Sequence, residues 1–200
     1  MNVIEVNGSL RTVLGKKEAK SLRKEEKVPC VIYGGEAPVH ISVAQAELRK
    51  LIFTPNIYIV NLKIDGKEYK SIMQDVQFDP VSDAVTHIDF LQISEDKAVK
   101  IEVPVKVKGF SKGVKAGGKL KQDLRKLRIK ALPAFLPDFV EINVENLEIG
   151  QAIKVGELIR ENIEFLNNKS TPVVSVVITR AAKAALVAAA AAEAKTTKKK

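Results

Sequence analysis

The sequence has little of the chemistry on which enzymes and metal sites usually depend. It contains a single cysteine, Cys30, so no intrachain disulfide or cysteine-rich zinc site is expected, and a reducing intracellular compartment is predicted. Its two histidines, His40 and His87, leave little material for a histidine-based metal or catalytic cluster. Neither a nucleophile elbow nor a metal-ligand spacing is present. We therefore expect no enzyme activity, no small-molecule substrate, no cofactor and no bound metal.

Aromatic residues and long apolar runs are also scarce. The chain has no tryptophan, seven phenylalanines and three tyrosines. Outside its alanine-rich end, no apolar run approaches the ~18–20 residues that a membrane span requires. Residues 1–15 lack the apolar region of a secretory signal. Because 46% of the 200 residues are hydrophobic and 28% are charged, the composition indicates a globular protein of one or two domains with no membrane partner.

Positive charge is in excess and is unevenly distributed. The chain has 33 basic and 24 acidic residues, a net charge of +9. Residues 11–27 contain seven basic and three acidic side chains, and residues 97–130 contain twelve basic and two acidic side chains. Two basic blocks of this kind are typical of a polyanion-binding protein. A solvated surface explains the composition about equally well.

Short segments of alternating polarity predict a mostly β, α+β protein that begins with a barrel-like domain carrying helices, residues 1–93. Residues 16–27 and 44–53 are predicted to be helices, the first ending near Val28 because Pro29 follows. The Asp65-Gly66 pair predicts a hairpin. The expected strands are residues 1–14, 29–33, 39–43, 57–64, 67–75 and 86–92.

A polar linker, residues 94–98, precedes a second β-rich domain, residues 99–180. Residues 99–108 alternate sharply, with Pro104 on the polar face, where its missing N–H favours an edge strand or a bulge. We expect a loop at residues 109–118 and one long strand at 119–132, although a helix fits the first part of that strand almost as well. Further expected strands are residues 140–144 and 173–178, and residues 151–159 are expected to be a strand or loop followed by a helical turn. Residues 181–200 form a low-complexity Ala/Lys tail, a frayed helix with a basic end that is either solvated or in nonspecific contact with phosphates.

The predicted helix at 16–27 concentrates cations on one side. On a helical wheel Lys16, Lys20, Arg23 and Lys27 fall within about 60° of arc, opposite Glu18 and Glu25. Like charges at this spacing are mildly unfavourable in an isolated helix. A polyphosphate partner explains the arrangement better than a solvated face, because neutralised phosphates release counterions.

Three other polar features are weaker signals. In a strand, His87 and Asp89 point outward when Ile88 and Phe90 point into the core. Such a pair is half of a catalytic arrangement, a reader of base edges, or an ordinary exposed pair, and the last is the simplest interpretation. Gln74 and Gln77 supply donors and acceptors on a nearby polar face, and Tyr33 is interpreted more simply as core than as a base-stacking residue. Gly113–Gly118 lacks the Lys-Ser/Thr of a phosphate-binding P-loop.

These residues occur in the order seen in a known family. Residues 1–93 resemble the bacterial large-subunit ribosomal protein L twenty-five family, and residues 98–180 are similar to the extra domain of its long form, often called general stress protein Ctc. The landmarks in the first part are Arg11, Gly15-Lys16, Leu22-Arg23, Pro29-Cys30-Val31-Ile32-Tyr33-Gly34, Gln74-Asp75-Val76-Gln77 and His87-Ile88-Asp89-Phe90. Those in the second are Val103-Pro104-Val105, Gly109, Gly113-Val114-Lys115, Gly117-Gly118 and Ile149-Gly150.

The resemblance implies a structural protein of the 50S subunit, cytoplasmic and on the ribosome. Its basic helix would enter the minor-groove side of the loop E region of 5S rRNA, and barrel residues would add contacts to base edges and backbone. The implied RNA contacts are Arg11, Lys16, Lys20, Arg23, Tyr33, Gln74, Gln77, His87 and Asp89. The second domain would contact neighbouring rRNA or ribosomal proteins, a hypothesis that rests on its charge.

The chain departs from the family pattern in the helix. Lys17 stands where a small residue is common, and Lys20-Ser21 stands where the family often has Arg-Arg. A lysine supplies a point charge instead of the bidentate hydrogen-bonding fork of an arginine. The contact at Lys20 is therefore expected to keep its positive charge and to have weaker hydrogen-bond geometry. A stress-related protein adaptor that acts away from the ribosome is the alternative function, and an enzyme that uses His87 and Asp89 is a more distant one.

Overall fold

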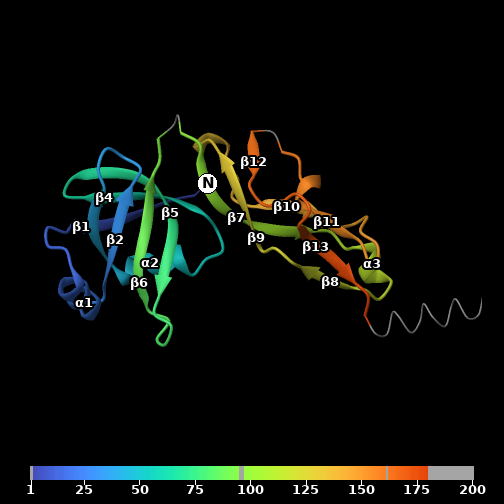
Figure 1. Ribbon diagram of the computed structural model, residues 1–200, viewed down its shortest axis with the longest axis horizontal. Helices are drawn as coiled ribbons and strands as arrows, with labels where there is room; N and C mark the ends of the chain where they lie inside the picture. Colours follow the sequence, from blue (N-terminus) through green and yellow to red (C-terminus); the bar gives the residue numbers. More distant parts are fainter. Residues whose placement is uncertain (1, 95–96, 161, 180–200) are drawn as a thin grey trace, which may run out of the picture. The chain divides into compact units, whose positions relative to one another are not determined.

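The computed structural model describes residues 2–94, 97–160 and 162–179 (Figure 1). The chain divides into two compact units. One consists of Met1–Val103 with Lys130–Asp138, and the other of Pro104–Ile129 with Phe139–Lys200. Both units are built mainly from strands, which confirms the predicted mostly β class.

A closed six-stranded barrel forms most of the first unit. Its strands follow the order β1-β3-β2-β6-β5-β4, in which β1 pairs with β4, and β2 with β6, in parallel. Closure pairs every strand on both sides and so removes exposed sheet edges. The predicted barrel with helices is therefore confirmed. The bounds are β1 (Asn2–Leu10), α1 (Lys16–Lys24), β2 (Lys27–Tyr33), β3 (Val39–Ala44), α2 (Gln45–Ile52), β4 (Tyr58–Ile64), β5 (Lys67–Phe78) and β6 (Val85–Gln92).

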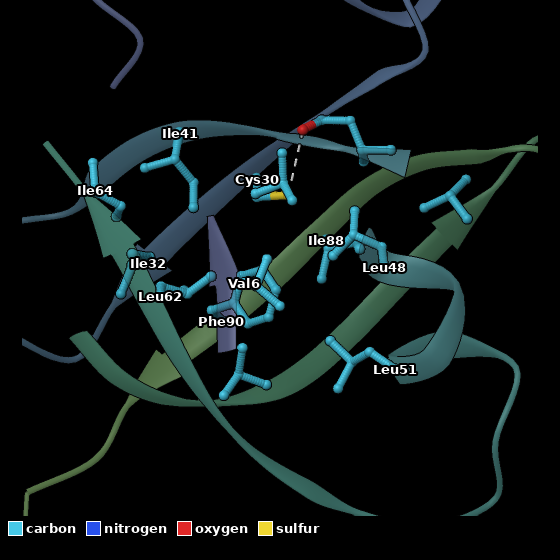
Figure 2. Packing of buried hydrophobic residues seen from close by; sticks show 14 residues of the cluster. Val6, Cys30, Ile32, Ile41, Leu48, Leu51, Leu62, Ile64, Ile88 and Phe90 are labelled. Carbon is cyan, nitrogen blue, oxygen red and sulfur yellow. Dashed lines mark hydrogen bonds between the residues drawn. The ribbon is translucent and has the colours of Figure 1, made fainter. Parts of the chain in front are cut away.

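Inward-pointing residues of these strands fill the barrel (Figure 2). Val6, Cys30, Leu62, Ile88 and Phe90 are all 0% exposed and come from four different strands. Two leucines of α2, at positions 48 and 51, join the same cluster. The polar residues that alternate with these apolar ones must therefore lie on the outer surface of the barrel.

The predicted turn between β4 and β5 is confirmed. Asp65 and Gly66 have φ values of 46° and 83°, so both central residues are left-handed, as in a type I′ hairpin. The helix predicted at residues 44–53 is also present, as α2. The six strands expected in residues 1–93 thus fold as the local pattern indicates, with boundaries that shift by a few residues.

The rest of the chain forms two further sheets. One has the order β10-β7-β9-β12 and the other β11-β13-β8. The bounds are β7 (Val99–Lys108), α3 (Lys112–Lys115), β8 (Lys119–Gln122), β9 (Lys126–Ala131), β10 (Val140–Asn143), β11 (Ala152–Lys154), β12 (Ile163–Phe165) and β13 (Pro172–Val177), with 3-10 turns at Pro133–Phe135 and Val155–Glu157.

Three local expectations for this region need correction. Pro104 is buried instead of lying on the polar face, and its strand β7 lies between two others, so of the two expected settings the edge strand is ruled out and the bulge is left. The long strand expected at 119–132 is broken into β8 and β9, because the N–H groups of Asp123 and Leu124 both turn to the carbonyl of Val173. The loop at 109–118 contains the helical turn α3, which Ser111 caps.

Among the described residues, no helix has the length and apolarity to cross a bilayer. The predicted helical and basic tail at 181–200 lies outside the described residues.

Candidate nucleic-acid interface

Helix α1 is shorter than its sequence predicts. It begins at Lys16, after Gly15 with φ of 138°, and ends at Lys24 rather than near Val28. The chain reverses at Glu26, whose φ is 57°, and the carbonyl of Glu26 accepts a 2.9 Å hydrogen bond from the N–H of Gln45. Lys27 is therefore the first residue of β2 and does not belong to the helical stripe, which correctly comprises Lys16, Lys20 and Arg23.

The basic stripe of α1 faces away from the barrel. Leu22 is the buried residue of the helix, which lies beside β2 (Figure 1). On the helical wheel Lys20 lies about 160° from Leu22 and Lys16 about 120° from it. Both lysines are exposed. Their charges are therefore available to a partner outside the barrel.

Arg23 connects the stripe to the barrel surface. Its Nε donates a 3.0 Å hydrogen bond to the carbonyl of Thr86 in β6. The β5–β6 register runs from Gln77 opposite His87 to Phe78 opposite Val85, so Thr86 is an extra residue in a β-bulge. The hydroxyl of Thr86 donates to the carbonyl of Gln77 at 3.1 Å and steadies this bulge. The other guanidinium donors of Arg23 have no hydrogen-bond partner among the described residues.

His87 and Asp89 point outward from β6, as the alternation predicts. Their neighbours Ile88 and Phe90 are both 0% exposed, whereas His87 and Asp89 are partly exposed. His87 Nδ1 lies 2.7 Å from Asp89 Oδ1, so the two side chains are in direct contact. Gln77 is directly opposite His87 on β5.

Asp75 is a residue that the sequence reasoning missed. It lies directly opposite Asp89, one residue after a second bulge that accommodates Gln74 between Met73 and Asp75. Gln74 and Asp75 are consequently both exposed, although they are adjacent in a strand. Carboxylates that face each other across two strands repel. The one sequence signal that pointed to Asp75 was its position within the segment Gln74-Asp75-Val76-Gln77.

Tyr33 is not part of the core, which corrects the simpler interpretation. Ile32 points into the barrel, and Tyr33 lies on the other face of β2, half-buried. Burial raises the pKa of Tyr33, and the negative charges of Asp89 and then Asp75 raise it further. Because these charges act on its phenol, Tyr33 belongs to the same outer surface as Asp89.

Arg11 lies in the same surface. Its N–H donates a 2.9 Å hydrogen bond to the carbonyl of His40, which continues the β1–β3 pairing by one residue. In the register His40 is opposite Val31, Val31 is next to Asp89, and Asp89 is opposite Asp75. An outward row therefore crosses the barrel from the end of β1 to β5, and neighbouring members are ~5 Å apart. Its members are Arg11, His40, Val31, Asp89 and Asp75.

The nine predicted contact residues thus form two groups that Arg23 and Thr86 connect. Lys16, Lys20 and Arg23 lie on α1, and the other six residues lie on or beside the outward row of the barrel. A hollow of about 220 Å³ lies next to this connection, and no sequence signal indicated it. Its polar lining residues are Arg23, Lys27, Gln45, Asp79, Ser82 and Thr86.

The chemistry of this surface is that of recognition. It combines cations on a helix with imidazole, amide, phenol and carboxylate groups, which together supply donors and acceptors for phosphates, hydroxyls and base edges. Within the described part of the chain, no group of three or more His, Cys, Asp or Glu residues is arranged to hold a metal ion. The thiol of Cys30 is buried in the barrel and does not reach the surface.

Comparison with known proteins finds close similarity along the chain. Residues 6–90 match the Ribosomal L25p family, and residues 98–180 match the family described as Ribosomal protein TL5, C-terminal domain. Large ribosomal subunit protein bL25 of Azobacteroides pseudotrichonymphae is 47% identical over 185 residues, which cover 92% of this chain and 98% of that protein. The protein of the same name from Bacteroides fragilis strain YCH46 is 47% identical over 188 residues, and that of Porphyromonas gingivalis strain W83 is 44% identical over 185. Each covers 92% of this chain and 96% of its own length.

Proposed function

Because the chain belongs to the bL25 family of large-ribosomal-subunit proteins, in the long form with a TL5-type C-terminal domain, we propose that it binds 5S rRNA through α1 and the outward row of the barrel. Membership of the family makes it a structural ribosomal protein, located on the ribosome in the cytoplasm, and not an enzyme. The resemblance inferred from the residues is correct, and the alternative of an enzyme that uses His87 and Asp89 is set aside.

The observation that carries the proposal is the bond between Arg23 and Thr86. It joins the basic helix to the strand that presents His87 and Asp89, so that one ligand can contact both. The stripe of Lys16, Lys20 and Arg23 contacts phosphates, which contributes affinity without sequence preference. The barrel groups provide the discrimination.

Recognition by the barrel follows from its donors and acceptors. Asp89 accepts from base amino groups or ribose hydroxyls, and Gln77 both donates and accepts. The wide, shallow minor groove of RNA exposes the 2′-hydroxyls and base edges that such groups contact. The non-Watson–Crick pairs of loop E alter this groove, and we propose that His87 and Asp89 read the altered shape.

The full chain should be titrated with 5S rRNA, and with a duplex RNA of equal length that lacks loop E, at several salt concentrations. Specific binding should weaken as salt rises. Lys20→Ala should flatten the slope of log K against log salt by ~0.7–0.9, the contribution of one phosphate contact. Lys50→Ala is a matched control, because Lys50 is an exposed lysine on α2, and it should bind like the wild type.

Equal affinity for the two RNAs would contradict the 5S assignment. A protein adaptor that acts away from the ribosome would then be the better function. Circular dichroism of each variant establishes that a loss of affinity does not arise from unfolding.

A further inference from the structure

Phe110 is the most exposed phenylalanine of the chain, with 73% of its surface accessible. It lies between β7 and α3, outside the surface proposed to bind 5S rRNA. In a sequence with 46% hydrophobic residues, a single exposed apolar side chain needs no explanation. Phe110 differs from such a residue because its backbone is fixed and because the charged residues within five positions of it along the chain are all lysines.

The loop holds Phe110 outward. Gly109, with φ of 90°, is in a conformation that favours glycine, and a Cβ there would lie 2.5 Å from Glu145 Cγ. On the other side, Ser111 is 2% exposed and its hydroxyl donates a 2.7 Å hydrogen bond to the carbonyl of Leu147. The N–H of Lys112 donates to the carbonyl of Glu145 at 3.2 Å. Because the chain is anchored before and after it, the ring cannot turn inward without breaking these bonds.

Lysines surround Phe110 along the chain. Residues 103–122 contain no aspartate or glutamate, and their lysines are Lys106, Lys108, Lys112, Lys115, Lys119 and Lys121. Lys108 and Lys112 are each two residues from Phe110, so their Cα atoms lie within ~7 Å of its own.

The lysines that follow the ring are uncompensated. In the described ranges neither Lys112 nor Lys115 has an ion-pair partner, whereas Lys108 is 3.9 Å from Glu141 and Lys121 is 2.6 Å from Asp123. An apolar pocket of a protein partner would have to desolvate these charges. A polyanion with aromatic groups would neutralise them and cover the ring.

We propose that Phe110 is a stacking platform for an unpaired RNA base and that Lys108, Lys112 and Lys115 contact the phosphates beside that base. Every base has a π-face, so an exposed aromatic ring on a rigid loop binds it without reading its sequence. The site lies on a different segment from α1 and the barrel, and it does not depend on 5S rRNA binding. It gives the TL5-type part of the chain its own contact with RNA.

The chain offers a local reporter for this site. It has no tryptophan, and its tyrosines, at positions 33, 58 and 69, are all in the barrel, so Phe110→Trp introduces a single fluorophore. The full-length variant should be titrated with a single-stranded RNA of about 12 nucleotides, within the range that one such surface covers. Stacking should quench the tryptophan emission in a saturable manner. A fully paired duplex should quench it much less, and heparin, a polyanion without bases, should compete without quenching.

Phe135→Trp is the matched control. Phe135 is 49% exposed, and no lysine or arginine lies within two residues of it, so its tryptophan should not respond to the RNA. In the otherwise wild-type chain, Phe110→Leu should lower the affinity of the Phe110 site by about 5- to 100-fold, and Phe135→Leu should not. Competition of each unlabelled protein against the Phe110→Trp chain for the RNA measures this affinity.

Three results would overturn the proposal. One is emission at position 110 that single-stranded RNA leaves unchanged, and another is a Phe110→Leu chain that competes like the wild type. The third is a blue shift without quenching when the Phe110→Trp chain joins the large subunit, which would show that a protein pocket covers the ring.

Discussion

Arg23 of α1 and Thr86 of β6 are 63 positions apart in the sequence, yet Arg23 Nε donates a 3.0 Å hydrogen bond to the Thr86 carbonyl. The acceptor lies in a β-bulge directly before His87. A lysine cannot reproduce this geometry, because the three donors of its ammonium share one nitrogen, whereas the five donors of a guanidinium lie on three nitrogens in a fixed plane. The bond therefore orients the remaining donors of Arg23 beside His87.

Arg23→Lys should separate the charge of this residue from its geometry. We expect the affinity for 5S rRNA to fall while the salt slope stays that of the wild type, because the cation remains and the Nε contact is lost. Arg23→Ala should lower the affinity and also flatten the slope by ~0.7–0.9. Titrations at four or more salt concentrations provide both quantities. Identical slopes for the two variants would contradict the phosphate contact.

Burial raises the pKa of Tyr33, and the opposed carboxylates of Asp89 and Asp75 raise it further. Since both charges raise its pKa, and Asp89 does so more strongly, Asp89→Asn should lower the pKa of Tyr33 more than Asp75→Asn. Carbon NMR of the tyrosine rings during an alkaline titration separates Tyr33 from Tyr58 and Tyr69. Asp75→Asn should also raise the free energy of unfolding of the free protein by about 0.2–1 kcal/mol, because it removes a like-charge pair. Unchanged stability would mean that the two carboxylates do not repel.

The thiol of Cys30 should be inert in the folded protein. Burial raises its pKa from 9.0 to about 12, so it stays protonated at neutral pH. Thiol reagents attack thiolates, and labelling should therefore proceed at the rate of global unfolding and accelerate sharply in urea. Because the folded pKa is the higher one, this group contributes stability below pH 9 that is lost as the pH rises towards 12. Rapid labelling at pH 8 without denaturant would contradict the buried position.

Gly113→Ala should damage the second unit and spare the barrel. A Cβ at this position would lie 2.7 Å from the carbonyl carbon of Glu148 and 2.8 Å from the N atom of Ile149, so backbone must move. We expect a loss of about 1–3 kcal/mol in the stability of that unit. Affinity for 5S rRNA should be unchanged, because α1 and the outward row lie elsewhere in the chain. The control is Gly66→Ala, which meets no atom within 4 Å but is strained by its φ of 83° in the barrel.

Local patterns predicted much of the barrel. Alternation indicated β3, β4 and β6, the Asp65-Gly66 pair indicated its hairpin, and the burial of Ile88 and Phe90 fixed His87 and Asp89 on the outside. These predictions hold because period-two polarity and left-handed turn residues act over a few neighbouring residues. The basic stripe of Lys16, Lys20 and Arg23 was also predictable, because helical spacing likewise acts over a few neighbouring residues.

Helix ends and strand breaks were less predictable, because distant parts of the chain determine them. The reversal at Glu26 is held by Gln45, and the break after β8 is made by the carbonyl of Val173. Pro104 lies in an inner strand although its local chemistry favours an edge. Placing a residue against its local propensity costs little free energy compared with what the burial of apolar side chains contributes. The tertiary arrangement therefore decides such positions.

The sequence by itself determined the class of fold, the family, the basic stripe and the outward His87 and Asp89, since each depends on composition, order or short spacing. Only the tertiary structure decided which of these residues meet. The pairing of β1, β3, β2, β6 and β5 aligns Arg11, Asp89 and Asp75 in one row, a bulge turns the Thr86 carbonyl towards Arg23, and the anchored loop keeps Phe110 exposed. Register, bulges and anchoring depend on hydrogen bonds between residues far apart in the chain, and no local pattern encodes them.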